Sequence, residues 1–143
     1  MSDCSDQSRI VFRSDLDDVR TEQLTGFFVG WPDPPCPQRH LEILRASHGV
    51  EFAVDENTGQ VVGFINVISD GVFSAFIPLL EVLPEYQGQG IGRRLVENVV
   101  GRYQHLYMLD LCCDEAVVPF YESIDFQRVV GMVHRNFEHQ SGR

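Results

Sequence analysis

One segment past the middle of the chain constrains the fold more than any other. Residues 82–96 read V-L-P-E-Y-Q-G-Q-G-I-G-R-R-L-V: an apolar stretch stops at Pro84, a glycine-rich turn follows, and an apolar pattern of helical period begins. Gly88, Gly90 and Gly92 allow the backbone to approach a ligand closely and to adopt positive φ angles. The unpaired amides at a helix start carry partial positive charge. The segment therefore predicts a strand–turn–helix unit that binds a phosphate or pyrophosphate.

Two common nucleotide motifs do not fit this turn. A P-loop ends in G-K-[ST], whereas this turn continues G-I-G-R-R. The dinucleotide fingerprint G-x-G-x-x-G requires a third glycine where this chain has Arg93, counted from Gly88, or Leu95, counted from Gly90. A turn that only reverses the chain remains the structural alternative.

A third motif fits. The pattern Q-x-x-G-x-G at Gln87, Gly90 and Gly92 closely resembles the acetyl-CoA signature of the GNAT superfamily, the Gcn5-related N-acetyltransferases. The preceding V-L-P-E-Y resembles the usual lead-in of that family. The resemblance implies a small bacterial-type enzyme with acetyl-CoA as co-substrate.

A second block strengthens the resemblance. Residues 114–126, D-E-A-V-V-P-F-Y-E-S-I-D-F, are similar to the family pattern N-x-x-A-x-x-x-Y-x-K-x-G-F, with matches at Tyr121 and Phe126. Asp114 replaces the usual Asn, and its carboxylate would repel phosphates. Asp125 replaces the usual Gly, and we expect it to end a helix in the left-handed conformation, which Asp tolerates better than most residues.

The hydrophobic periodicity predicts the element order β-α-α-β-β-β-α-β-α-β. This order favours an α/β (α+β) domain with a mixed sheet and helices on both faces, and the resemblance implies the mostly antiparallel acyl-CoA N-acyltransferase fold. The expected strands are residues 9–13, 50–54, 60–68, 72–83, 106–112 and 126–137, and the expected helices are residues 15–28, 38–47, 89–103 and 116–123.

The chain length of 143 residues predicts one domain over 1–143, with flexible ends at 1–8 and 138–143. The net charge of −10 opposes nucleic-acid binding and can attract a cationic ligand, although it can also serve only solubility. The four cysteines lack C-x-x-C spacing and the five histidines are scattered, so we expect no metal. The polar start and the lack of a long apolar run predict a cytoplasmic protein that does not engage membranes.

The resemblance assigns the cofactor contacts to one strand end, the turn and the helix start. Val82 and its neighbours are expected to offer backbone groups to the pantetheine arm, which requires a locally open ladder. Pro78 lacks an N–H and agrees with a bulge there, but also with a simple edge strand. The expected cofactor-binding residues are Val82, Leu83, Gln87, Gly88, Gln89, Gly90, Ile91, Gly92, Arg93 and Asp114.

Two residues are the predicted catalytic groups. Tyr121 is expected to act as the acid for the leaving thiolate, with packing between helix and sheet as the alternative reading. Glu81 is a lone carboxylate in an apolar segment, so burial would raise its pKa and suit it as a base or as the anchor of a water relay. A solvent-facing strand residue is the alternative for Glu81, and Asp110 is the second candidate base.

Phe27, Phe28 and Trp31 are expected to form the acceptor pocket, although such residues more often lie in a core. The predicted function is transfer of an acetyl group from acetyl-CoA to a primary amine of a small molecule. The alternatives are a protein or peptide N-acetyltransferase and a non-catalytic acetyl-CoA-binding regulatory module. The resemblance also makes a homodimer through residues 126–137 possible.

Overall fold

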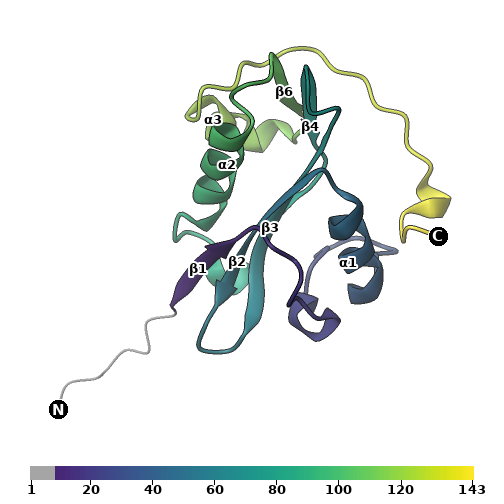
Figure 1. Ribbon diagram of the computed structural model, residues 1–143. Helices are drawn as coiled ribbons and strands as arrows, with labels where there is room; N and C mark the ends of the chain where they lie inside the picture. The colour runs from purple at the N-terminus through teal and green to yellow at the C-terminus, as the bar shows by residue number, and fades with distance from the viewer. Residues whose placement is uncertain (1–8) are drawn as a thin grey trace.

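The computed structural model describes residues 9–143, so the expectation for residues 1–8 lies outside the described part. Its centre is a mixed, mostly antiparallel sheet in the order β1-β2-β3-β4-β6, with β5 also pairing with β3 (Figure 1). Among the strand pairs of residues 9–143, only β4–β6 is parallel. The predicted sheet type is therefore confirmed. The strands are β1 (Ile10–Arg13), β2 (Gly49–Asp55), β3 (Gln60–Ser69), β4 (Ser74–Ile77), β5 (Leu80–Val82) and β6 (Met108–Leu111).

Helices cover both faces of this sheet, as predicted. Adjacent residues of β3 show the alternation: Gly63 faces Ile91 and Leu95 of one helix, whereas Phe64 packs against His40 of another. The helices are α1 (Pro37–Ala46), α2 (Ile91–Arg102) and the short α3 (Val118–Glu122), with 3-10 turns at Thr21–Leu24, Pro84–Tyr86, Glu115–Val117 and Phe137–His139. Because both faces are covered, β3 is buried continuously from residue 61 to residue 67.

The sheet splits where β4 passes into β5. The pairing with β3 shifts by one residue between Ile68–Phe76 and Ile65–Leu80, with Pro78 in the gap. Asn66 bridges the shift, because its side-chain oxygen accepts the Leu79 N–H at 3.1 Å. β6 continues beside β4 to Leu111 and does not pair with β5 in the described chain. A gap therefore opens between β5 and β6.

The predicted helix over residues 15–28 is wrong. Only Thr21–Leu24 forms a helical turn there. The Asp15 side chain accepts the Asp17 N–H at 2.8 Å, a local bond that competes with a helix start. Gly26 and Phe28 both have positive φ angles, of 90° and 63°, which a right-handed helix excludes.

The predicted strand over residues 126–137 is also wrong. The chain is irregular from 126 to 136, and one 3-10 turn follows. A strand needs a neighbour to complete its hydrogen bonds, and this segment pairs with no strand within residues 9–143. The end of the chain returns to the loop before α1, where the Asp33 N–H donates to the Gln140 side chain at 2.9 Å.

Candidate active site

The glycine turn has the backbone shape that an anion site requires. Gly88 and Gly90 have φ angles of 78° and 83°, and Gly90 caps α2 in the left-handed conformation without a side-chain hydrogen bond. The first intrahelical bond runs from the Arg94 N–H to the Gly90 oxygen at 3.1 Å. The backbone amides of Ile91, Gly92 and Arg93 therefore have no intrahelical acceptor and point out of the helix start.

Side chains brace this turn from three directions. Gln87 donates its amide to the Val82 carbonyl at 2.9 Å, which ties the turn to the end of β5. Tyr86 donates its hydroxyl to Asp55 at 2.7 Å. Arg93 donates to the Ser123 hydroxyl at 3.0 Å, beyond α3. In this structure Gln87 is therefore a brace of the turn, and its side chain is engaged within the protein.

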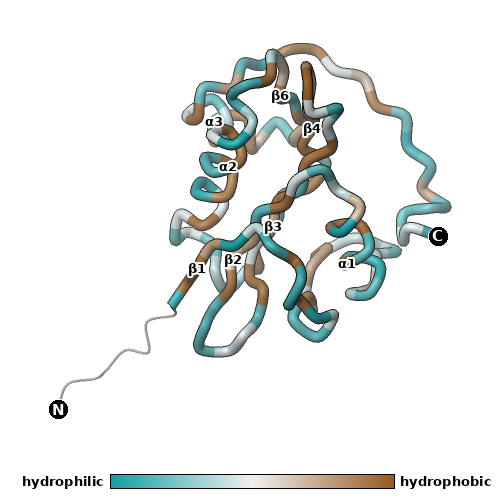
Figure 2. The backbone as a smooth tube through the Cα atoms, in the orientation of Figure 1, coloured by the Kyte–Doolittle hydropathy of each residue, from teal (hydrophilic) through white to brown (hydrophobic). Residues whose placement is uncertain are grey.

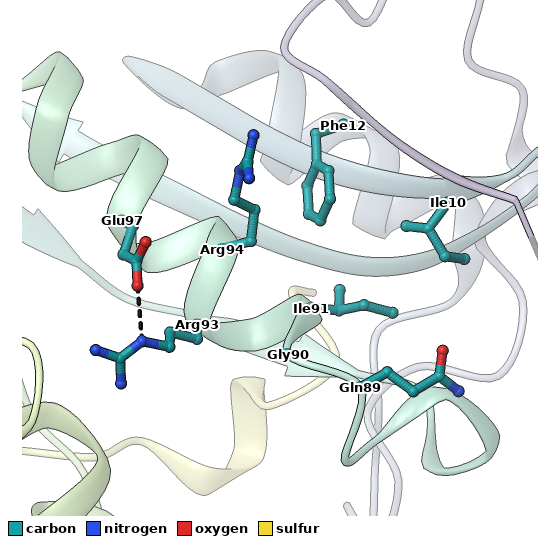
Figure 3. Close-up of a pocket in the computed structure, with 8 residues that line it drawn as sticks. All are labelled: Ile10, Phe12, Gln89, Gly90, Ile91, Arg93, Arg94 and Glu97. Carbon is teal, nitrogen blue, oxygen red and sulfur yellow. Dashed lines mark ion pairs between the residues drawn. The ribbon is translucent and has the colours of Figure 1, made fainter.

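A cavity of about 360 Å³ opens beside the start of α2 (Figure 3). Its lining carries two arginines and one glutamate: Arg93 pairs with Glu97 at 2.7 Å, and the Arg94 guanidinium, 5.6 Å from the centre of the Phe12 ring, supplies the remaining positive charge. Together with the free amides of α2, these charges favour an anionic ligand group. The lining residues are Ile10, Phe12, Gln89, Gly90, Ile91, Arg93, Arg94 and Glu97.

A second cavity, of about 270 Å³, lies where β5 and β6 part. It brings together Glu81 and Tyr121, the two predicted catalytic residues, with Phe28 and Trp31, two of the predicted acceptor residues. Phe27 instead lies in the core, where its ring contacts those of His40 and Phe64. The lining residues are Phe28, Trp31, Phe64, Ile77, Pro78, Leu79, Leu80, Glu81, Leu111, Cys112, Cys113, Val117 and Tyr121.

Glu81 holds the loop that carries the aromatic wall. Both of its carboxylate oxygens accept the Phe28 N–H, at 2.9 and 2.8 Å. Phe28 has the left-handed φ of 63°, a conformation that needs such support in a residue with a bulky side chain. Burial raises the pKa of Glu81, and the N–H groups of Phe28 and Val29 partly oppose that rise.

Tyr121 is a buried phenol at the cavity wall, with 8% of its surface exposed. Burial, with a smaller contribution from nearby Cys113, raises the pKa of Tyr121 to about 12. The hydroxyl therefore keeps its proton at neutral pH and can donate a hydrogen bond into the cavity. The helix that carries it ends at Glu122, three residues before Asp125, whose φ of 67° confirms the predicted left-handed conformation.

The free edge of β5 offers backbone groups beside the second cavity, which Leu80 and Glu81 line. The Leu83 N–H donates to Val62 of β3 at 2.8 Å, and the Leu79 carbonyl accepts from Asn66 at 3.3 Å. Because the backbone direction alternates along a strand, the groups of Leu80 and Val82 face away from β3, toward the gap. An extended ligand could bind along this edge.

Comparison with known proteins identifies the fold and the family. A family model described as Acetyltransferase (GNAT) family matches residues 16–126. The chain belongs to the GNAT acetyltransferase family. The crystal structure of a proposed acetyltransferase from Deinococcus radiodurans R1 is 42% identical over 92% of each chain, with a TM-score of 0.89. A GNAT family protein from Streptococcus pneumoniae TIGR4 is 30% identical over 90% of this chain and 98% of its own, with a TM-score of 0.72.

Among curated relatives, a histone acetyltransferase of Glycine max named TAP1 is 31% identical over 83% of this chain. The match covers 56% of that protein, so the chain spans about half the length of the curated relatives it matches. GNAT enzymes use acetyl-CoA as co-substrate. No helix in residues 9–143 is long and apolar enough to cross a membrane.

The described residues fit the elongated GNAT co-substrate. The cationic helix start suits its phosphates, and β5, which lines the cavity with Tyr121, is tied to the turn before that helix by the bond from Gln87 to the Val82 carbonyl. Asp114 is exposed in the loop after β6 and lines neither cavity. Leu83 is a buried residue, with 7% of its surface exposed, so only its backbone could contribute to co-substrate binding.

Several residues at this GNAT site were not predicted from the sequence. Cys112 and Cys113 line the cavity, and Phe64 from β3 forms part of its wall. Nothing local in the sequence marks Phe64, because β3 reaches the cavity only through the sheet split. Asp110, the second candidate base, is exposed and does not line this cavity. No group of three or more His, Cys, Asp or Glu side chains within residues 9–143 could hold a metal ion.

Proposed function

We propose that this chain transfers the acetyl group of acetyl-CoA directly to a primary amine of a small molecule. The observation that carries the proposal is the shared cavity of Glu81 and Tyr121 at the gap between β5 and β6. In that cavity Glu81 can take a proton and Tyr121 can donate a hydrogen bond. The free edge of β5 connects this cavity to the anion-binding start of α2.

The proposed phosphate contacts come from the turn. The amides of Ile91, Gly92 and Arg93 would bind the pyrophosphate, with Gly88, Gln89 and Gly90 shaping the approach. The backbone groups of Leu80 and the N–H of Val82 would bind the pantetheine amides, as an added strand binds a sheet edge, while the Val82 carbonyl keeps its bond to Gln87. Acetyl-CoA supplies the activated carbonyl, and the protein supplies its position.

The reaction then needs two proton movements. The nitrogen of the neutral amine forms the new bond to the carbonyl carbon, and the bond between carbon and sulfur breaks. Glu81 would accept the ammonium proton, directly or through water, because each of its oxygens has a free lone pair besides the Phe28 hydrogen bond. The raised pKa of Glu81 makes it a stronger base than an exposed glutamate.

Tyr121 would stabilise the leaving sulfur by hydrogen bonding. A thiol has a pKa of about 8.5, so full proton transfer from a phenol with a pKa of about 12 is uphill. A hydrogen bond from the phenol to the sulfur strengthens as negative charge develops there, which is the stage at which catalysis needs it. The nitrogen would lose its second proton to water as the amide forms, the sulfur would take one proton from water, and Glu81 would return its proton to solvent, so that one proton is released per turnover.

The cavity favours a small cationic acceptor. At about 270 Å³ it lies slightly below the usual range of small-molecule pockets. Phe28 and Trp31 supply aromatic faces beside the Glu81 carboxylate, a combination that attracts an ammonium. The net charge of −10 adds long-range attraction for a cation and repulsion for nucleic acid. We expect the enzyme to act in the cytoplasm.

A protein acceptor is the second candidate, favoured by the Glycine max relative named as a histone acetyltransferase. The first experiment is a thermal shift with acetyl-CoA, using NAD and ATP as controls. At about 100 times its dissociation constant, a bound ligand adds about 2.7 kcal/mol of stability. A thiol-release assay would then compare small amines with basic peptides. No shift with acetyl-CoA would refute the proposal, and a preference for peptides would favour the second candidate.

A catalytic role is tested separately from binding. Glu81→Gln should lower turnover at least about tenfold while the acetyl-CoA thermal shift remains. A bound co-substrate with no turnover on any amine or peptide would instead indicate a non-catalytic acetyl-CoA-binding module.

A further inference from the structure

Two adjacent cysteines, Cys112 and Cys113, are a feature of the second cavity that the proposed acetyl transfer does not use. Both follow directly after β6, which ends at Leu111, and both line the cavity. Because the strand has ended, the alternation that turns neighbouring side chains of a strand to opposite faces does not separate them. Both are free thiols on exposed residues. A thiol becomes a strong nucleophile once it loses its proton.

The two thiols have different surroundings. Cys112 Sγ faces the chain after α3, since a Cβ placed on Gly131 would lie 3.8 Å from that sulfur. This part of the chain has a hydrophobic stretch, residues 129–133, which Figure 2 shows in brown. Cys113 instead lies close to Tyr121, because it is, after burial, the second cause of the raised pKa of that phenol. Cys113 is therefore the member of the pair that lies beside Tyr121.

The ligand expected in this cavity has a sulfur of its own. Under the proposed function, on which this inference rests, the thioester sulfur of acetyl-CoA lies where the Tyr121 hydroxyl can donate a hydrogen bond to it. Cys113, beside Tyr121, is then a thiol next to the sulfur position of the co-substrate. A disulfide of the CoA thiol carries the same phosphates and the same pantetheine arm. The start of α2 and the edge of β5 would therefore bind this disulfide as they bind acetyl-CoA.

We propose that Cys113 is a covalent modification site for disulfides of the CoA thiol, which bind in place of acetyl-CoA. The Cys113 thiol gives its proton to water, and the thiolate attacks the disulfide sulfur that lies beside Tyr121. A bond forms between these two sulfurs, and the original sulfur–sulfur bond breaks. The second half of the disulfide leaves as a thiolate and takes one proton from water. Cys113 is thereby oxidised to a mixed disulfide, and the departing half is reduced to a thiol.

Position, and not the ease of ionisation, selects Cys113 for this exchange. Cys36 is an exposed free cysteine immediately before α1, and it lines neither cavity. The N–H group of Arg39, with a smaller contribution from that of Gln38, lowers the pKa of the Cys36 thiol. A disulfide that reacts with the most easily ionised thiol should therefore modify Cys36. A disulfide that is first bound in the cavity should modify Cys113, because binding holds the reacting sulfurs together.

The mixed disulfide would block catalysis. The CoA half attached to Cys113 would occupy the phosphate and pantetheine contacts, so that acetyl-CoA could not bind. Turnover would stop until a reducing thiol released the attached half. The site would thus make the enzyme respond to oxidation of the thiol that its own reaction produces.

The test compares two disulfides on the full chain, in which Cys4, outside the described residues, is replaced by serine in every form. One probe is the symmetric disulfide of CoA, and the other is hydroxyethyl disulfide, which is small and uncharged. Peptide mapping by mass spectrometry gives the rate of adduct formation at each cysteine. With the CoA disulfide, Cys113 should react at least about tenfold faster than Cys36. With the small disulfide, Cys36 should react faster.

Competition and single variants locate the reacting thiol. Excess acetyl-CoA should slow the reaction of the CoA disulfide at Cys113 and leave the rate at Cys36 unchanged. Cys113→Ser should lose the fast reaction, whereas Cys112→Ser, the matched substitution of its neighbour, should retain it. In the wild type, the loss of turnover should follow adduct formation at Cys113 and should be reversed by a reducing agent.

The thermal shift with acetyl-CoA separates this inference from the proposed function. A wild type that shows the shift but reacts with the CoA disulfide no faster at Cys113 than at Cys36 would overturn the modification site and leave the proposed function intact. Fast reaction at Cys112 in place of Cys113 would also overturn it. No thermal shift, together with no preference for Cys113, would refute the proposed function and the modification site together.

Discussion

His40 predicts a specific dependence of stability on pH. It is a histidine in the core, 1% exposed, with neither ring nitrogen hydrogen-bonded within the described residues. Its ring lies 4.3 Å from that of Phe64 and 4.9 Å from that of Phe28, centre to centre. Burial lowers the pKa of His40 from 6.5 to about 4. The folded protein therefore holds this ring neutral at pH values where the unfolded chain protonates it.

The direction in which stability changes with pH follows from proton uptake by the unfolded state. Below pH 6.5 the unfolded state binds a proton at His40 and the folded state does not, so the free energy of unfolding falls as the pH falls. The loss ends near pH 4, where the folded state also protonates. At 1.36 kcal/mol per pKa unit, the full loss is about 3 kcal/mol. Between pH 7.5 and pH 5.0 it is about 2 kcal/mol.

The assay is urea unfolding of the wild type and His40→Leu at pH 7.5 and 5.0, followed by the fluorescence of Trp31, the single tryptophan. Carboxylate titration is common to both proteins and cancels in their difference. The free energy of unfolding of His40→Leu, relative to that of the wild type, should therefore rise by about 2 kcal/mol between pH 7.5 and pH 5.0. His105→Asn, at an exposed histidine, should keep the wild-type dependence on pH. Equal losses in wild type and His40→Leu would refute the argument, because His40 would then not be held neutral by burial.

Three further predictions concern the proposed cofactor and catalytic groups. Gly90→Ala forces a side chain into a left-handed conformation and should cost about 1 kcal/mol of stability; calorimetry should also show weaker acetyl-CoA binding, whereas Gly101→Ala, within α2, should leave binding unchanged. Asp114→Asn removes a carboxylate from a position where the family pattern has Asn and should tighten acetyl-CoA binding by up to about fivefold; weaker binding would mean that Asp114 is a useful contact. Tyr121→Phe should lower turnover at least about tenfold with acetyl-CoA affinity near wild type, and unchanged turnover would remove Tyr121 from the mechanism.

The parts of the fold that depend on local patterns could be predicted from the sequence. The glycine turn, the helix after it and the left-handed Asp125 each rest on a few adjacent residues with strong conformational preferences. The prediction of a helix over residues 15–28 was wrong because local interactions there overrode the apolar spacing. Its apolar spacing was roughly helical, but the Asp15 side chain and the positive φ angles of Gly26 and Phe28 determine the actual path. The spacing of apolar residues indicates which residues are buried. In this segment the buried residues lie in a loop and not in a helix.

The strand expected over residues 126–137 shows another limit. Strand preference belongs to the segment, whereas a strand exists only with a partner, and no partner lies within the described chain. Periodicity cannot indicate whether that partner is in the same copy. In the same way, Phe64 could not be assigned to the cavity, because it reaches the wall only where the pairing of β3 shifts from β4 to β5.

Glu81 shows how the two kinds of information combine. Its isolation in an apolar segment marked it as a candidate base, but only the structure shows that both oxygens hold the Phe28 N–H. The proposed base and the aromatic acceptor wall are therefore mechanically connected, since Phe28 keeps its left-handed φ with the help of that carboxylate. Protonation or replacement of Glu81 should accordingly weaken acceptor binding as well as proton removal. A substitution that changed turnover alone, with the acceptor KM unaltered, would separate the two roles and assign the support of Phe28 to the rest of the loop.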